Sequence, residues 1–139
     1  GHQKEIIEKI IDKHNKIKCV FNEHFESGMA SSIKTGLNNL SKKSEAFFIC
    51  LADMPEVNKN VYVKLIKNKN NKKIIVPTYN GKQGNPVLFS IEIKEKINSL
   101  EGDIGAKGIL KENEDHIFYV ETNDKGVKKD FNTQESFNY

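Results

Sequence analysis

One aspartate has a position that suits metal-assisted chemistry. Asp53 follows the continuous apolar run of residues 46–51, and Pro55 ends that run two residues later. Such a run is typical of a strand buried on both faces, and ligands of open α/β sheets bind at the carboxyl ends of the strands. A carboxylate held there is a suitable oxygen ligand for Mg²⁺. Capping of a helix after Pro55 is an equally good interpretation of the position alone.

A second group of candidate residues begins an expected helix. Gly28 is followed by Met-Ala and then by Ser31 and Ser32. Backbone N–H groups and hydroxyls at a helix start can hold a polar or anionic ligand, although small residues are common at this position in any helix.

Glycine-containing turns give weaker signals later in the chain. Gly81, Gly84 and Pro86 lie between two strand-like runs, where we favour a simple hairpin turn over a ligand-binding loop. Asp103 follows Gly102 before another helical stretch, and an aspartate in that place usually caps the helix.

Several other chemistries lack the residues they need. The histidines are too scattered for a zinc site, and there is no Gly-x-Ser-x-Gly nucleophile motif. Cys19 and Cys50 each lie inside an apolar run, so we expect two buried, unpaired thiols in a reducing compartment. The sequence therefore favours chemistry by positioning and charge neutralisation over covalent catalysis.

The elements that position these residues alternate between helix and strand. Apolar periodicity predicts helices over residues 3–16, 31–40, 59–67 and 91–100, around residues 109–110, and after residue 133. Strands are predicted over residues 17–22, 46–51, 74–79, 86–89 and 116–120. This alternation predicts an α/β fold, a three-layer sandwich with a mainly parallel, Rossmann-like sheet.

Composition agrees with one domain over residues 1–139. The formal charge is +3, from 22 basic and 19 acidic residues, and the basic residues are spread along the chain, so charge gives no reason to expect nucleic acid. No apolar stretch is long enough to span a bilayer, and the chain does not open with a secretion leader. We therefore expect a cytoplasmic protein without a membrane partner.

Five short patterns occur in the order of one family's successive signatures. They are Gly28-Met-Ala-Ser-Ser-Ile-Lys-Thr-Gly-Leu37, Ala52-Asp-Met-Pro55, Pro77-Thr-Tyr-Asn-Gly-Lys-Gln-Gly-Asn-Pro-Val-Leu-Phe89, Gly102-Asp-Ile-Gly-Ala-Lys107 and Asp130-Phe-Asn-Thr133. Together they resemble the molybdenum cofactor cytidylyltransferases among the MobA-like NTP transferases, which have the nucleotide-diphospho-sugar transferase fold. The resemblance covers essentially the whole chain.

The resemblance implies transfer of CMP from CTP to the phosphate of molybdopterin or molybdenum cofactor, with release of pyrophosphate. It implies Asp53 and Asn132 as catalytic Mg²⁺ ligands. A molybdenum hydroxylase would be a candidate recipient of the product. Nucleotide and substrate contacts are implied at Gly28, Ser31, Ser32, Gly81, Gly84, Asn85, Pro86 and Asp103.

The chain departs from the family's pattern in two places. Asn85 stands where the family usually has histidine, and an amide cannot take a proton at neutral pH. The family's N-terminal strand and glycine-rich phosphate loop have no counterpart before Gly1, so we expect an N-terminally incomplete domain and expect these 139 residues alone to be inactive. Alternatively, Gly1 and His2 are an expression scar on a natural short paralogue.

Two other functions stay open. One is a nucleotidyltransferase of the same fold that acts on another phosphate or sugar phosphate, for example with GTP. The other is a nucleotide-binding module without catalysis, which the missing loop and Asn85 would favour.

Overall fold

The computed structural model describes residues 1–11, 16–99 and 105–133, and these divide into two compact units. One unit comprises residues 1–44 and 94–109, and the other residues 45–93 and 110–139. Asp103 and the predicted C-terminal helix lie outside the described residues. The prediction of a single domain stays a prediction.

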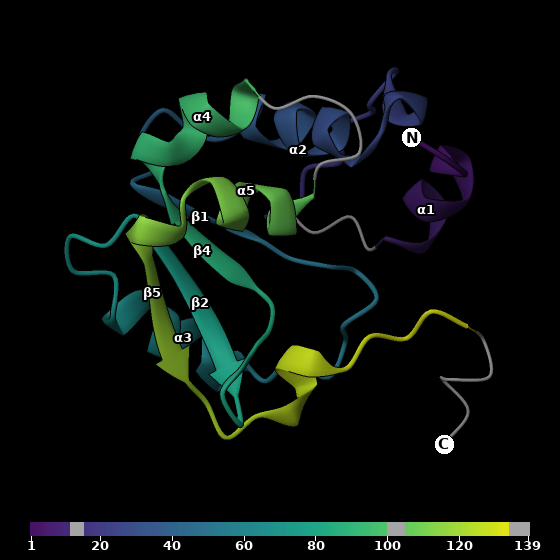
Figure 1. Ribbon diagram of the computed structural model, residues 1–139. Helices are drawn as coiled ribbons and strands as arrows, with labels where there is room; N and C mark the ends of the chain where they lie inside the picture. Colours follow the sequence, from purple (N-terminus) through teal and green to yellow (C-terminus); the bar gives the residue numbers. More distant parts are fainter. Residues whose placement is uncertain (12–15, 100–104, 134–139) are drawn as a thin grey trace. The chain divides into compact units, whose positions relative to one another are not determined.

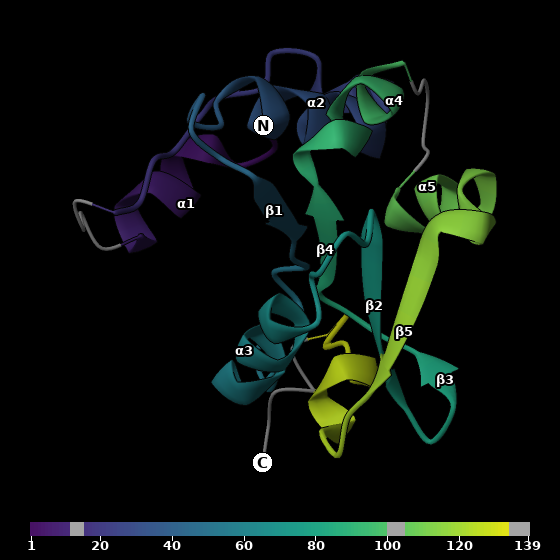
Figure 2. The ribbon, with the colours of Figure 1, turned by 90° about the vertical axis from the view of Figure 1, so that its left-hand side faces the viewer.

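The second unit is built on a five-stranded sheet (Figure 1). Its strands are β1 (Ala46–Ile49), β2 (Ile74–Tyr79), β3 (Lys82–Gln83), β4 (Val87–Ser90) and β5 (Ile117–Glu121). Figure 2 shows β1, β4, β2 and β5 side by side in that order. β4 runs antiparallel to both of its neighbours, while β2 and β5 are parallel, so β1, β2 and β5 all point the same way. The predicted α/β class is confirmed, with a mixed sheet in which β3 and β4 run opposite to the other three strands.

Helix α3 (Lys59–Lys67) covers one face of this sheet. Its predicted bounds are confirmed, as are those of β2. Val61 and Leu65 point from the helix into a core that includes Ile75 of β2, Leu88 of β4 and Val120 of β5. Because side chains alternate along strands, Phe47 and Phe89 belong to the opposite face, where their rings stack with centroids 5.5 Å apart. Strands β2 and β5 are therefore fixed by packing on α3.

The remaining elements of the second unit are short. They are the 3₁₀ turns η2 (Ile91–Ile93), η3 (Glu114–His116) and η4 (Lys125–Lys128). The residue Val127 of η4 is fully buried in the same core as α3, which anchors the segment that follows β5.

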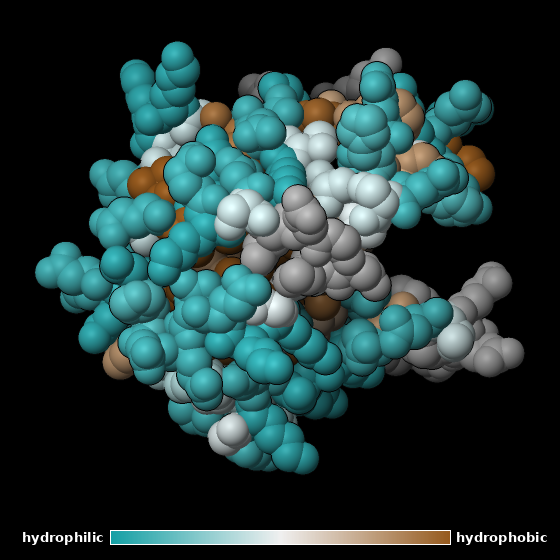
Figure 3. Space-filling model, turned by 45° about the horizontal axis from the view of Figure 1, so that its top comes forward, coloured by the Kyte–Doolittle hydropathy of each residue, from teal (hydrophilic) through white to brown (hydrophobic). Residues whose placement is uncertain are grey.

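The first unit is helical in its described part. It contains α1 (Lys4–Ile10), the 3₁₀ turn η1 (Phe25–Ser27), α2 (Met29–Asn38) and α4 (Lys94–Asn98), while α5 (Ala106–Glu112) spans the boundary between the units. α2 packs on α4 and on η1. The apolar side of α1 is exposed, with Ile10 76% accessible. The face of the molecule in Figure 3 is mostly hydrophilic, with small separate apolar patches.

Three expectations from the sequence are wrong. The strand predicted over residues 17–22 does not form, because that segment pairs with no strand among the described residues. Within the described part of the chain β1 lies at the edge of the sheet and pairs with β4 alone, and of its side chains only Phe47 is buried. Cys19 and Cys50 are both exposed, since one lies in the irregular segment and the other follows the end of β1.

No described helix has both the length and the apolar character needed to cross a membrane.

Candidate functional site

Asp53 lies in the loop between β1 and α3, and one of its carboxylate oxygens lacks a hydrogen-bond partner. The side chain is half-buried, and its Oδ1 atom is shielded from solvent without a hydrogen-bond partner. A buried carboxylate oxygen costs free energy unless a cation or a hydrogen-bond donor compensates it. The donor type and the unpaired oxygen together fit a hard divalent cation such as Mg²⁺.

The capping interpretation of Asp53 is wrong. The N-cap of α3 is Asn58, whose Oδ1 accepts a 2.9 Å hydrogen bond from the backbone N–H of Asn60. The backbone N–H of Asn58 in turn donates to the carboxylate of Asp124 at 2.7 Å. The helix start is therefore satisfied without Asp53, and its carboxylate is left for another role.

The segment that follows β5, residues 124–131, packs against the Asp53 loop, residues 53–58. Lys129 forms a 2.6 Å ion pair with Glu56, and Phe131 donates its backbone N–H to the carbonyl oxygen of Asp53 at 2.8 Å. At Gly126 the backbone approaches so closely that a Cβ there would lie 2.4 Å from the carbonyl oxygen of Glu56. Packing thus holds residues 124–131 along residues 53–58.

These contacts place Asn132 in the same part of the second unit as Asp53. The Asn132 side chain is exposed, and its Nδ2 donates to the carboxylate of Asp130 at 2.8 Å. An amide that donates through its nitrogen keeps its oxygen available as a hard ligand. Sequence reasoning passed over Asp130 as a site residue, although the Asp-x-Asn spacing could have indicated it.

No cluster of three or more metal-binding side chains (histidine, cysteine, aspartate or glutamate) occurs among the described residues. Mg²⁺ is commonly bound by one or two carboxylates and completes its coordination with water and substrate phosphates. The site at Asp53 likewise offers few protein ligands to a metal.

The hairpin between β2 and β3 confirms the turn interpretation of Gly81. Tyr79 and Lys82 pair across a two-residue loop in which Asn80 has φ 50° and Gly81 has φ 71°. Glycine and asparagine tolerate this left-handed conformation, which two-residue hairpins of this kind require. The carboxylate of Glu121 accepts the backbone N–H groups of Asn80 at 2.8 Å and of Gly81 at 3.4 Å.

Glu121 also accepts a very short hydrogen bond from the hydroxyl of Thr78. That bond, with help from the backbone donors of the hairpin and from nearby Lys64, lowers the pKa of Glu121 below its ordinary value. A charged carboxylate therefore fixes the turn at the carboxyl end of β2.

The segment from Gly84 to Pro86 packs against η4. Gly84 donates its N–H to the carbonyl oxygen of Pro77, and Asn85 donates to that of Val127, both at 2.8 Å. A Cβ on Gly84 would lie 2.4 Å from the Val127 carbonyl oxygen, so this position requires glycine. The Asn85–Pro86 peptide bond is cis. Residues 124–131 therefore contact both this segment and the Asp53 loop.

The hydroxyls at the start of α2 belong to the first unit and are partly committed. The buried side chain of Asn22 donates through Nδ2 to Ser31 Oγ at 2.8 Å and to Ser32 Oγ at 2.9 Å. Ser31 also reaches the carbonyl oxygens of His24 and Gly28, both at 2.8 Å. Ser31 thus holds the loop before α2, whereas the exposed Ser32 hydroxyl donates to no acceptor among the described residues. Nothing in the sequence pattern had singled out Asn22.

The structure gathers part of the predicted site. Asp53, Gly81, Gly84, Asn85, Pro86 and Asn132 all belong to the second unit, where η4 and the residues after it connect their segments. Gly28, Ser31 and Ser32 belong to the first unit.

Solved structures share this fold at low sequence identity. The Rv0371c homolog from Mycobacterium sp. strain JC1 is 20% identical with a TM-score of 0.69, and the match covers 79% of this chain and 55% of that one. The 4-diphosphocytidyl-2C-methyl-D-erythritol synthase from Anaerococcus prevotii DSM 20548 is 16% identical with a TM-score of 0.72, over 95% of this chain and 70% of that one.

A third related structure is a manganese complex of Rv0371c from Mycobacterium tuberculosis H37Rv, 21% identical with a TM-score of 0.55, over 66% of this chain and 50% of that one. The chain therefore spans only about half the length of the Rv0371c proteins that it matches. No curated protein matches the chain.

The family model of the MobA-like NTP transferase domain matches residues 3–117, which is most of the chain. The chain belongs to the family of MobA-like NTP transferase domains.

Proposed function

We propose that this domain belongs to a nucleotidyltransferase that moves CMP from CTP to the terminal phosphate of molybdopterin or molybdenum cofactor, releasing pyrophosphate. The observation that carries the proposal is the buried, unpartnered Oδ1 of Asp53 beside the Asp130-x-Asn132 segment. Family membership supports the reaction type. The proposed setting is cytoplasmic, with a molybdenum hydroxylase as the recipient of the product.

Asp53 and Asn132 would hold Mg²⁺ in this proposal. The metal would supply charge neutralisation at the phosphates, which is the main requirement of phosphoryl transfer. The manganese complex of the structural relative Rv0371c supports a divalent cation in this fold.

The protein's own groups would bind and orient the two substrates. The hydroxyl of Ser32 and the start of α2 after Gly28 suit the nucleotide phosphates. Gly81, Gly84 and Pro86 lie in the turns that follow β2, and Asn85 can form hydrogen bonds with an acceptor substrate there. Asp103 would join the acceptor side.

Cytidine is the proposed base because of the resemblance in the five sequence patterns. One structural relative is by its name a diphosphocytidyl compound synthase, which supports cytidine in this fold.

Metal binding tests the carrying observation directly. We expect Mn²⁺, titrated by electron paramagnetic resonance in the presence of CTP, to bind Asp53→Asn at least about tenfold more weakly than wild type. Asp115→Asn is the matched control, because Asp115 is an exposed aspartate of η3 in the same unit. Equal Mn²⁺ affinity in wild type and Asp53→Asn would overturn the assignment.

Pyrophosphate release in the protein that contains this chain tests the reaction, with molybdopterin as acceptor and CTP or GTP as donor. Faster release from GTP would favour the guanylyl alternative. Nucleotide binding without pyrophosphate release in either arm would favour a non-catalytic module.

A further inference from the structure

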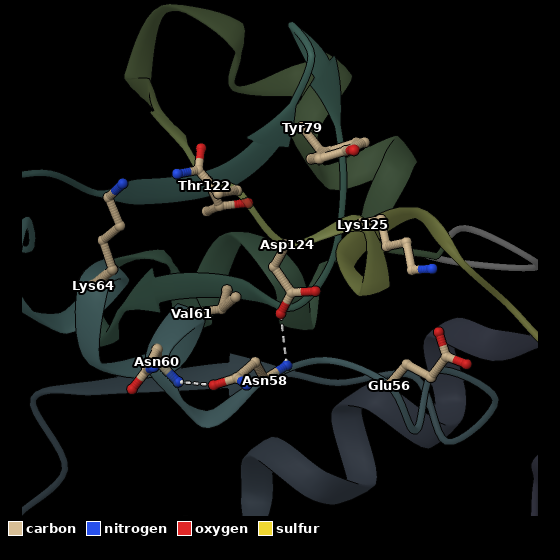
Figure 4. Close-up of a pocket in the computed structure, with 10 residues that line it drawn as sticks. Glu56, Asn58, Asn60, Val61, Lys64, Tyr79, Thr122, Asp124 and Lys125 are labelled. Carbon is tan, nitrogen blue, oxygen red and sulfur yellow. Dashed lines mark hydrogen bonds between the residues drawn. The ribbon is translucent and has the colours of Figure 1, made fainter.

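A cavity of about 620 Å³ lies at the N-terminal end of α3, entirely within the second unit (Figure 4). It is lined by Glu56, Asn58, Asn60, Val61, Lys64, Tyr79, Thr122, Asn123, Asp124 and Lys125. Asp53 is not among these residues. The volume is within the range of about 300–1,000 Å³ that is typical of small-molecule sites.

The two acids of the cavity wall are already compensated. The carboxylate of Asp124 accepts the backbone N–H groups of Asn58 at 2.7 Å and of Gly126 at 2.8 Å. Glu56 pairs with Lys129 at 2.6 Å. Both carboxylates therefore already have hydrogen-bond or ion-pair partners within the protein.

The two lysines of the wall keep donors to spare. Lys64 uses one ammonium proton on the carbonyl oxygen of Glu121 at 2.6 Å, which leaves two others. Within the described parts of the chain, Lys125 has no acidic side chain at ion-pair distance. Figure 4 shows the two lysines on opposite sides of the cavity. Each ammonium group stands on a flexible four-carbon stem.

The rest of the lining combines hydrogen-bonding groups with a small apolar wall. Asn60 and Asn123 contribute exposed amides, whereas Val61 and the half-buried ring of Tyr79 contribute apolar surface. A ligand that fits this lining is anionic at one end and has a compact carbon skeleton.

We propose that this cavity is a second ligand site, distinct from the Asp53 site, that binds a small organic phosphate of about the size of a pentose phosphate. Its phosphate group binds Lys64 and Lys125, and its carbon skeleton lies against Val61 and Tyr79. The inference does not rest on the proposed transferase activity.

Heteronuclear NMR titration tests the site, with ribose 5-phosphate and inorganic phosphate as probes, at constant ionic strength and with EDTA to remove divalent metals. Ribose 5-phosphate is expected to give saturable shifts at residues 58–64 and 122–125, and to bind more tightly than inorganic phosphate. Lys64→Gln should weaken binding at least about tenfold, the effect of losing one charge-assisted hydrogen bond.

Three further variants test whether binding depends on this cavity rather than on general positive charge or on the Asp53 site. Lys67→Gln removes the same charge from the same helix, at an exposed position outside the lining, and should bind as wild type does. Asn60→Trp fills the cavity without a charge change and should abolish the shifts. Asp53→Asn should bind ribose 5-phosphate normally, because the proposed metal site is separate.

The proposal is overturned if no saturable shifts occur at residues 58–64 and 122–125. It is also overturned if Lys67→Gln weakens binding as much as Lys64→Gln does, or if Asn60→Trp, folded by circular dichroism, still binds.

Discussion

The backbone N–H of Phe131 donates a 2.8 Å hydrogen bond to the carbonyl oxygen of Asp53. This bond joins the candidate metal ligand, which follows β1, to the segment that follows β5. The Phe131 side chain is buried, at 4% exposure, and the ammonium of Lys129 lies 4.4 Å from its ring centroid. The geometry around Asp53 therefore depends on residues near the end of the described chain.

Truncation of the buried Phe131 side chain should loosen the Asp53 loop. Phe131→Ala is expected to lower the free energy of unfolding by about 3–5 kcal/mol, because it empties a buried site. Phe118→Ala is the matched control, since Phe118 is 37% exposed on β5 and should cost about 1 kcal/mol or less. Urea denaturation measures both. Similar losses in the two variants would contradict the anchoring role of Phe131.

Two glycines should respond to alanine with opposite signs. Gly84→Ala places a Cβ 2.4 Å from the Val127 carbonyl oxygen, so it should destabilise the protein by about 1–3 kcal/mol. Gly36 lies within α2 and nothing lies within 4 Å of an added Cβ, so Gly36→Ala should stabilise it by about 0.5–1 kcal/mol. Thermal or urea unfolding of the two variants measures both changes in stability. A neutral Gly84→Ala would mean that η4 can move away at little cost.

Glu121 should make stability depend on acid pH. Its folded pKa is lowered from 4.5, chiefly by the hydrogen bond from Thr78, so the folded state favours the charged form. The resulting stabilisation is fully present above pH 4.5 and is lost as the pH falls through the lowered folded pKa. Glu121→Gln should therefore reduce the slope of unfolding free energy against pH below 4.5.

Glu114→Gln, which removes an exposed glutamate of η3, serves as the control for this measurement. It should leave the slope close to that of wild type. Identical slopes for wild type and Glu121→Gln would refute the role of Glu121.

The two cysteines should react with thiol reagents in the folded protein, but at different rates. Both are exposed. Burial nevertheless raises the pKa of Cys50, an effect that a hydrogen bond with Tyr62 partly offsets, so less thiolate forms at neutral pH. The labelling rate of Cys50, measured in Cys19→Ser, should be lower than that of Cys19, measured in Cys50→Ser.

Raising the pH should narrow this difference, because it restores the Cys50 thiolate. Tyr62→Phe should slow the labelling of Cys50 further, since it removes the contact that lowers the pKa. Faster labelling in Tyr62→Phe would show that Tyr62 shields the thiol instead.

The sequence by itself determined the elements whose signals are local. Helix α3 and strand β2 have the bounds predicted from periodicity, because the apolar residues of each element pack into the same core. The turn at Asn80 and Gly81 was also predictable, since few residues adopt positive φ without strain. The order of five short patterns was enough to indicate the family.

Only the tertiary structure decided which residues meet across the sheet. Among the described strands β1 pairs with β4 alone and so lies at the edge of the sheet, and Cys50 beyond its end is exposed. Asn58, and not Asp53 as the sequence also allowed, is the N-cap of helix α3, because the helix begins at Lys59. The bond from Phe131 to Asp53 joins distant parts of the chain, and such a contact depends on packing rather than on local preference.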